Sequence, residues 1–118
     1  MSEQSREARP QPPITPADIS VFEERGEYVL RNVDGQSLYQ YDLDGEDRSR
    51  CTNTCAVIWP PVFASIGSTA VVGNWKAIQR GNARQWSYRG KPVYVYSKDA
   101  PGETNGDGVD GKWRLLRI

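Results

Sequence analysis

One short pattern occurs twice in this chain, and it constrains the fold more than any other feature. A glycine is followed by Tyr-x-Tyr and then by an aspartate, first over residues 35–44 and again over residues 90–99. Trp59 and Trp113 follow the two copies at nearly equal distances. The chain is therefore predicted to contain two copies of one structural unit.

Each Tyr-x-Tyr segment predicts a short β-strand. Alternate side chains of a strand point to opposite faces, so Tyr39 and Tyr41 share a face, as do Tyr94 and Tyr96. Tyrosines in such positions pack their rings in the core while their hydroxyls reach hydrogen-bond partners. We favour this interpretation over a ligand site lined by the four tyrosines.

Asp44 and Asp99 come three residues after the second tyrosine of each copy, where the strand should turn. A short carboxylate there can accept backbone N–H bonds and close the turn. A second interpretation stays open, because repeat symmetry could bring the two carboxylates together as an enzyme's catalytic pair. A glycosidase of that kind would need carboxyl groups within about 10 Å of each other.

The length of 118 residues suits one domain with a real hydrophobic core. The chain is poor in long aliphatic residues and comparatively rich in Trp, Tyr, Gly and Pro, which favours short strands with tight turns. We predict a small all-β domain of antiparallel strands over residues 19–118, with repeat units at about 26–63 and 80–118. The polar, proline-rich residues 1–18 predict an extended or disordered tail.

Turn signals predict how the strands pair. Asp34-Gly35 between two apolar runs predicts a hairpin from residues 28–30 into the first Tyr-x-Tyr strand. Arg89-Gly90 predicts the same layout in the second unit. Further strands are expected over residues 75–80 and 112–118, and residues 67–73 form a small-residue connector.

Several classes of function are excluded by what the chain lacks. It has no histidine, which rules out Ser-His-Asp and Cys-His nucleophiles and zinc or haem sites that need imidazole. Its 15 basic and 15 acidic residues balance, so there is no general attraction to nucleic acid or anionic membrane. No apolar run approaches the roughly 18 residues of a transmembrane helix. We expect a monomer.

The motifs together resemble those of one known family, and the resemblance covers about residues 26–113. The family is the bacterial secreted-repeat family of predicted lipoproteins, which is defined by the pattern Tyr-x-(aromatic)-x-x-Asp. The matching segments are Asp34-Gly35, Tyr39-x-Tyr41-x-x-Asp44, Cys51-x-x-x-Cys55, Trp59-Pro60-Pro61, Arg84-Gln85-Trp86, Tyr94-x-Tyr96-x-x-Asp99 and Gly106-Asp107-Gly108. The resemblance implies a periplasmic or secreted location but no chemistry, because the family has no settled biochemical function. Members usually carry a lipoprotein or secretory signal. This chain shows neither a signal nor a lipobox cysteine, so its lipidation is not predicted.

Cys51 and Cys55 are predicted to form a disulfide. Two cysteines four residues apart can reach bonding geometry in a single turn, and an oxidising compartment preserves the bond. A soft metal site would need further Cys or His ligands, and the spacing differs from the Cys-x-x-Cys of redox centres. The bond would fix the approach of Trp59 to the core. Pro60 forces Trp59 into an extended conformation, and Pro60 and Pro61 then hold the direction of the chain.

Acidic residues follow both Tyr-x-Tyr strands, and a calcium site there is a weak alternative. Candidate ligands are Asp42, Asp44, Asp99 and Asp107, on glycine-bent loops with oxygen ligands of the kind that Ca²⁺ takes. The spacing is not that of an EF-hand, and Asp with Gly is also the ordinary chemistry of surface turns. Turn structure is the favoured interpretation, and no other cofactor is expected.

Four tryptophans and six tyrosines are many for a chain of this size. Most should fill the core, but Trp59, Trp86 and Trp113 on one exposed face would suit a sugar, a planar ligand or a protein. The leading hypothesis is a non-enzymatic module that binds a protein or small ligand of the bacterial envelope. The alternatives are a carboxylate-based enzyme and a purely structural domain.

Overall fold

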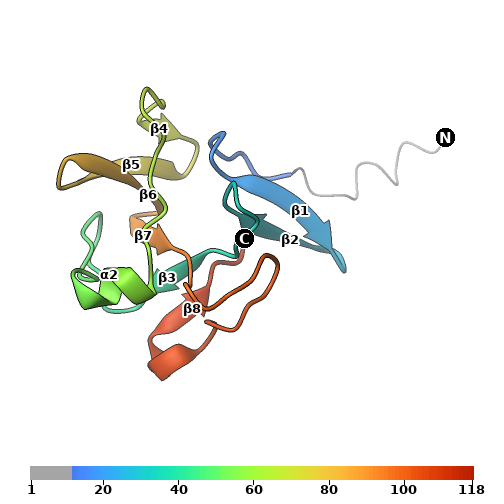
Figure 1. The fold of residues 1–118 in the computed structure, drawn as a ribbon. Coiled ribbons are helices and arrows are strands. Elements are labelled where there is room, and N and C mark those ends of the chain that lie inside the picture. The colour runs from blue at the N-terminus through green and yellow to red at the C-terminus, as the bar shows by residue number, and fades with distance from the viewer. Residues whose placement is uncertain (1–11) are drawn as a thin grey trace.

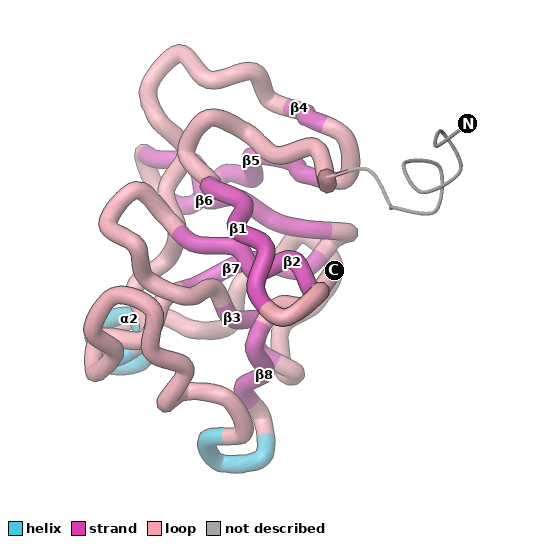
Figure 2. The backbone as a smooth tube through the Cα atoms, turned by 90° about the vertical axis from the view of Figure 1, so that its right-hand side faces the viewer, coloured by secondary structure: helices cyan, strands magenta, loops and turns pink. Residues whose placement is uncertain are grey.

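The computed structural model describes residues 12–118, which fold mainly into short strands joined by turns (Figures 1 and 2). The two helical elements are short, α2 at Thr54–Ile58 and η1 at Val109–Gly111. The strands are β1 (Ser20–Glu24), β2 (Glu27–Arg31), β3 (Tyr39–Tyr41), β4 (Val71–Val72), β5 (Trp75–Arg80), β6 (Ala83–Tyr88), β7 (Lys91–Tyr94) and β8 (Trp113–Leu115). Among the described residues, no helix has the length and apolar character needed to cross a membrane.

The strands form two sheets. β1 and β2 make a two-stranded sheet, and the other six lie in the order β4-β5-β6-β7-β3-β8. Every strand pairing is antiparallel. The prediction of a small, mostly β domain of antiparallel strands is confirmed.

The two Tyr-x-Tyr segments lie next to each other in the large sheet. β3 pairs with β7, and Tyr39 stands directly opposite Tyr94 in the register. β8 pairs with the other side of β3, placing Tyr41 opposite Trp113. The prediction that the two segments occupy equivalent places is confirmed, because an antiparallel pair relates its two strands by a local two-fold axis.

The hairpin predicted for the second unit is confirmed. β6 and β7 are joined by Arg89 and Gly90, whose φ angles are 50° and 85°. Positive φ at both central residues matches the twist of two-residue hairpins.

The hairpin predicted for the first unit is wrong. β2 pairs along its whole length with β1, through a tight turn at Arg25 and Gly26 with φ angles of 53° and 81°. The loop at Asp34-Gly35 leaves only one bridge between Arg31 and Ser37 before the chain departs to β3. β2 pairs with β1 because the turn at Arg25 and Gly26 closes a two-residue hairpin, which the longer loop at Asp34-Gly35 cannot do.

Two further predictions concern strand bounds. The strand predicted over residues 75–80 is confirmed as β5, whereas the connector predicted over residues 67–73 contains the short strand β4. The final strand is shorter than predicted, because β8 ends at Leu115. Leu116 still donates its N–H to the carbonyl of Leu38 at 2.8 Å, so the chain leaves the sheet just beyond.

The predicted tail of residues 1–18 lies partly outside the described residues, since residues 1–11 are not described. Of the described residues 12–18, some pack against the domain instead of forming a tail. Pro16 is buried, and Asp18 accepts hydrogen bonds from the indole Nε1 of Trp86 at 2.9 Å and from Ser65. Ordered packing therefore begins before Ile19, because Asp18 supplies the acceptor that a buried indole N–H requires.

Alternation along β3 and β7 divides the interior into two clusters. The aliphatic cluster contains Leu38, Val93 and Val95 together with residues from the β1–β2 hairpin and β6. The aromatic cluster lies on the other face and holds both Tyr-x-Tyr pairs. This alternation confirms the predicted faces of the two strands, and it places the repeat motif inside the molecule.

Candidate functional site

The motif residues exchange hydrogen bonds between the two repeats. The Tyr39 hydroxyl donates to Oδ2 of Asp99 at 2.5 Å, and the Tyr94 hydroxyl donates to Oδ2 of Asp44 at 2.7 Å. Each tyrosine therefore binds the aspartate of the opposite repeat. Asp44 and Asp99 are both buried, at 6% and 7% exposure.

The second oxygen of each carboxylate holds its own loop. Oδ1 of Asp44 accepts the N–H of Arg50 at 2.6 Å, and Oδ1 of Asp99 accepts the N–H of Asn105 at 2.9 Å. Both acceptors reach six residues ahead in their loops. The turn-closing arrangement expected from the sequence is present in both copies.

Burial controls the protonation of this network. Burial raises the pKa of Asp44, and the hydrogen bonds from Arg50 and Tyr94 offset only part of that rise. Burial, followed by the hydrogen bond to Asp99, raises the pKa of Tyr39 well above its ordinary value. Burial also raises the pKa of Tyr94. Both tyrosine hydroxyls therefore stay protonated and serve as donors.

Four aromatic rings form a continuous stack that also alternates between repeats. Tyr41 stacks on Trp113 at 4.2 Å, Trp113 on Trp59 at 3.8 Å, and Trp59 on Tyr96 at 4.2 Å between ring centroids. Tyr39 meets the edge of Trp59 at 5.3 Å, and Tyr94 meets Trp113 at 5.2 Å in the same way. Edge-to-face contacts such as these two are among the favoured geometries for aromatic pairs.

The tryptophans considered for an exposed binding face are buried instead. Trp59, Trp86 and Trp113 are exposed by only 4%, 0% and 3%. Trp86 lies in the aliphatic cluster, and the other two lie in the aromatic cluster. A flat sugar or protein contact made by these three rings is therefore not available, because a small domain with few aliphatic residues uses them as its core.

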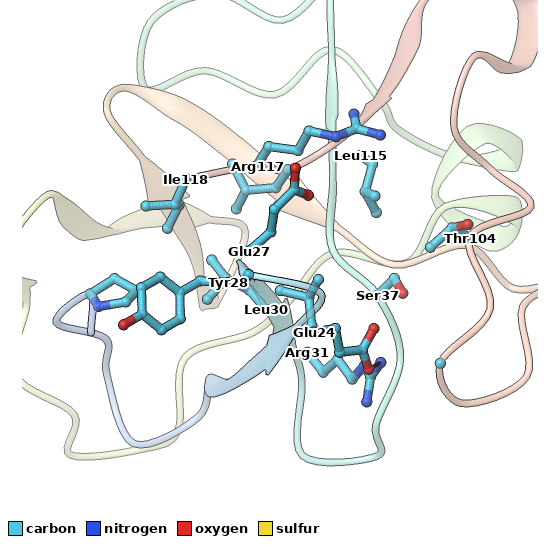
Figure 3. Close-up of a pocket in the computed structure, with 15 residues that line it drawn as sticks. Glu24, Glu27, Tyr28, Leu30, Arg31, Ser37, Thr104, Leu115, Arg117 and Ile118 are labelled. Atoms are coloured by element: carbon cyan, nitrogen blue, oxygen red, sulfur yellow. Dashed lines mark hydrogen bonds and ion pairs between the residues drawn. The ribbon is translucent and has the colours of Figure 1, made fainter. Parts of the chain in front are cut away.

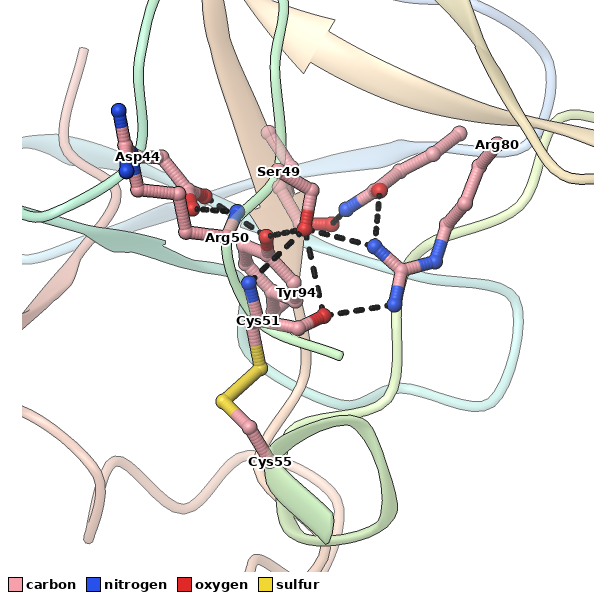
Figure 4. The surroundings of a disulfide bond; sticks show 9 residues. Asp44, Ser49, Arg50, Cys51, Cys55, Arg80 and Tyr94 are labelled. Carbon is pink, nitrogen blue, oxygen red and sulfur yellow. Dashed lines mark hydrogen bonds between the residues drawn. A yellow bond between two sulfur atoms is a disulfide. The ribbon is translucent and has the colours of Figure 1, made fainter. Parts of the chain in front are cut away.

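The predicted disulfide between Cys51 and Cys55 is present, with an S–S distance of 2.04 Å (Figure 4). Arg80 holds the loop before it by donating to Oγ of Ser49 and to the carbonyl of Cys51, both at 2.6 Å. Ser49 in turn lies 2.6 Å from the Tyr94 hydroxyl. The disulfide loop is thus joined to the exchanged network, by which we mean the Tyr39–Asp99 and Tyr94–Asp44 hydrogen bonds between the repeats.

The end of α2 carries Trp59 into the ring stack. The N–H of Trp59 donates to the carbonyl of Cys55 at 2.8 Å, and Trp59 leaves the helix with φ −122° and ψ 78°. Trp59 thus avoids the helical region, as expected before proline, although its ψ is smaller than that of a fully extended residue. Its indole stacks on Trp113.

The calcium candidates are engaged with other partners. Asp42 binds Nε of Arg114 at 2.9 Å, and Asp107 binds the N–H of Leu115 at 2.9 Å and Arg117 at 3.0 Å. The N–H of Leu115 lowers the pKa of Asp107. Asp44 and Asp99 belong to the exchanged network. Within residues 12–118, no three Asp, Glu, Cys or His side chains converge as metal ligands would.

A pocket of about 500 Å³ lies between the β1–β2 hairpin and the C-terminal residues (Figure 3). Its apolar lining includes Leu30, Leu115, Leu116 and Ile118. Both structural overviews place the C-terminus beside β2, as this pocket requires. Neither Asp44 nor Asp99 lines it.

Charged side chains surround the apolar lining of the pocket. Glu24, Glu27, Arg31 and Arg117 line it, and Arg31 donates to Glu24 at 2.7 Å. The Nε atom of Arg31 is buried and has no hydrogen-bond partner among the described residues. A buried donor without an acceptor costs about 1–3 kcal/mol.

None of the pocket residues was singled out from the sequence. The signal that points to them is Arg25-Gly26, which repeats the Arg89-Gly90 turn of the second unit. That turn indicates a β1–β2 hairpin separate from the main sheet, and the pocket lies where this hairpin meets the chain end.

Comparison with known proteins identifies the family but no close relative. A family model described as a secreted repeat of unknown function matches residues 23–63 and 76–117. No curated protein and no solved structure matches the chain. The two matched segments contain the two Tyr-x-Tyr strands and both exchanged aspartates. The chain belongs to this lipoprotein-type family of secreted repeats, and it contains two copies of the repeat.

Proposed function

We propose that this secreted-repeat domain is a non-enzymatic binding module that works outside the cytoplasm, in the periplasm or as a secreted protein. The pocket between β2 and the C-terminal residues is its binding site. The observation that carries the proposal is the pocket's size and lining, since cavities of about 300–1,000 Å³ with apolar walls and a few polar groups are typical ligand sites.

The location is supported by the family's description as secreted and by the disulfide. Disulfides persist in oxidising compartments and are rare where thiols are kept reduced. A Cys51–Cys55 bond therefore suits the envelope or the exterior of a bacterium.

The non-enzymatic character is supported by how the candidate carboxylates are used. Both oxygens of Asp44 and of Asp99 accept hydrogen bonds within the fold, and both side chains are buried. A catalytic carboxylate must have an oxygen within reach of the substrate. These two carboxylates instead hold the repeats together.

A thermal-shift screen tests the proposal. The panel contains sugars, quinones, haem, Ca²⁺ and transition metals, short peptides and amphipathic amines. A ligand that binds the native state raises its melting temperature, and Ile118→Asp should abolish the rise because Ile118 lines the pocket. Ile66→Asp is the matched control, since Ile66 is fully exposed and lies outside the pocket. No shift with any class, or turnover of any panel member, would overturn the proposal.

A further inference from the structure

We propose that the surface joining the two repeats is a dimer interface, and that a second copy of this chain can supply either side of it. In the exchanged dimer, the first repeat (residues 23–63) of one copy pairs with the second repeat (residues 76–117) of the other copy, and the reverse. The pocket plays no part in this dimer.

Strand pairing makes the first repeat dependent on the second. β3 pairs with β7 on one side and with β8 on the other, and both of these strands belong to the second repeat. Among the described residues before 64, strands pair with each other only in the β1–β2 hairpin. The first repeat therefore cannot complete its sheet without a copy of the second, as is usual for a subunit of an obligate dimer.

Backbone hydrogen bonds cross the interface in matched pairs. Leu116 donates its N–H to the carbonyl of Leu38 at 2.8 Å. Val62 and Val93 hold the same places relative to the Trp and Tyr-x-Tyr motifs of the other repeat, and Val62 donates its N–H to the carbonyl of Val93 at 3.0 Å. In an isologous two-fold interface, each contact is likewise made twice with its two sides exchanged.

Side chains cross the interface in the same way. The exchanged network consists of one Tyr–Asp hydrogen bond in each direction. Lys91, which follows the hairpin glycine of the second repeat, donates from Nζ to the carbonyl of Asp44 at 3.2 Å. Gln36, in the corresponding place of the first repeat, donates from Nε2 to the carbonyl of Asp99 at 3.5 Å. The two halves thus present similar surfaces, and the interface is self-complementary.

A single crossing of the chain separates this monomer from an exchanged dimer. Residues 64–75 connect the repeats and match neither copy of the family model. Ile66 and Gly67, near the middle of this connector, are exposed. The interface contacts named above do not involve the connector, so they would be the same if the second repeat came from another copy. Exchange of an identical element between two copies is a low-cost route to a dimer.

The test cuts the connector and mixes copies of the full chain. A protease site is inserted between Ile66 and Gly67, and light and ¹⁵N-labelled preparations are cut, unfolded together in urea without reductant, and refolded. Native mass spectrometry then identifies which repeats have paired. About half of the pairs should combine a light repeat with a heavy one, because either copy supplies the same surface.

Competition shows whether the pairing uses the exchanged network. When cut light chains with Tyr39→Phe compete with cut light wild-type chains for the heavy second repeat, pairs containing the variant should be about tenfold rarer. Tyr41→Phe is the matched control and should compete equally with the wild type, because its hydroxyl belongs to neither exchanged bond. Equal competition by both variants would mean that the repeats associate through a different surface, which would overturn the inference.

Uncut copies test the dimer itself. Light and heavy wild-type chains refolded together at high protein concentration should contain a dimer fraction, separated by gel filtration, in which light and heavy chains are mixed. A sample that stays entirely monomeric would contradict the exchanged dimer.

The cut chain gives two further outcomes against the inference. If the repeats separate or unfold once the connector is cut, or refold without forming mixed pairs, the interface does not accept a second copy. Before cutting, the chain with the insertion should melt as the wild type does, and a version with the site between Ser68 and Thr69 replaces it where it does not fold. If neither version folds, the connector supports the fold and the inference is wrong.

Discussion

Trp75 and Trp86 show how one hydrogen bond distinguishes two equally buried side chains. Both are 0% exposed and both belong to the aliphatic cluster. The Nε1 of Trp86 donates to Asp18 at 2.9 Å, whereas the Nε1 of Trp75 is buried with no partner among the described residues. Their packing is comparable, but only Trp86 ties the start of the domain to the sheet.

This difference predicts unequal costs for the same substitution. Trp86→Phe and Trp75→Phe remove the same atoms, so the cavity contributions are similar. Trp86→Phe also loses a hydrogen bond to a carboxylate, while Trp75→Phe removes an unsatisfied donor. The free energy of unfolding measured in urea should therefore be lower for Trp86→Phe than for Trp75→Phe by about 1–3 kcal/mol. Equal stability of the two variants would contradict the contribution assigned to the Asp18 bond.

Asp18 also predicts a pH dependence. Burial by itself raises the pKa of Asp18, but the hydrogen bonds from Ser65 and Trp86 outweigh it and lower the pKa. A carboxyl whose pKa falls on folding contributes stability above its unfolded pKa of about 3.9 and loses it as the pH drops through the folded value.

Asp18→Asn should therefore lower the melting temperature by a constant amount above about pH 5, and the deficit should shrink toward pH 2. Melting curves of both proteins across this range measure it. Asp34→Asn is the control for loss of a carboxylate, because the Asp34 side chain is exposed. A deficit that grows on acidification would have the wrong sign.

At the scale of elements, the disulfide fixes a loop rather than the domain. It closes only four residues of separation and leads into α2, which is exposed at Val57 and Ile58. Replacing both cysteines with serine should cost about 2 kcal/mol or less. Hydrogen exchange should increase over residues 51–59 and remain unchanged in β5 and β6. Loss of protection in those two strands would show that the bond supports more than its loop.

The sequence predicts elements best where the signal is local. The β6–β7 hairpin follows from Arg89-Gly90, and the loop-closing aspartates follow from their position after each strand. The partner of β2 is not local in this sense, because Arg25-Gly26 and Asp34-Gly35 compete for it and loop length decides the result. The pocket was missed for a related reason, since its lining combines segments distant in sequence, the β1–β2 hairpin and the C-terminal residues.

At the scale of the whole molecule, the two repeats form one unit because each completes the other. Tyr39 holds the loop of the second repeat through Asp99, and Tyr94 holds the loop of the first through Asp44. The four-ring stack alternates between repeats in the same order. The repeat pattern predicts equivalence of the two units, but not this exchange. A tyrosine bonded to the aspartate of its own repeat would produce the same sequence.

The central claim is that each tyrosine supports the loop of the opposite repeat, and residue-resolved hydrogen exchange of two variants tests it most directly. Tyr39→Phe leaves Asp99 and the N–H of Gly106 without the Tyr39 hydroxyl, to which they are bonded at 2.5 Å and 3.2 Å. The free energy of unfolding of Tyr39→Phe should fall by about 1–3 kcal/mol. Tyr41→Phe is the control, because the Tyr41 ring stacks but its hydroxyl belongs to neither exchanged bond.

Exchange should quicken at the amides of Asn105 and Gly106 in Tyr39→Phe, while the amide of Arg50 keeps its protection. In Tyr94→Phe the effect should be reversed, with Arg50 losing protection and Asn105 keeping it. If each substitution instead loosens the loop of its own repeat, the two repeats are not joined in the way described here.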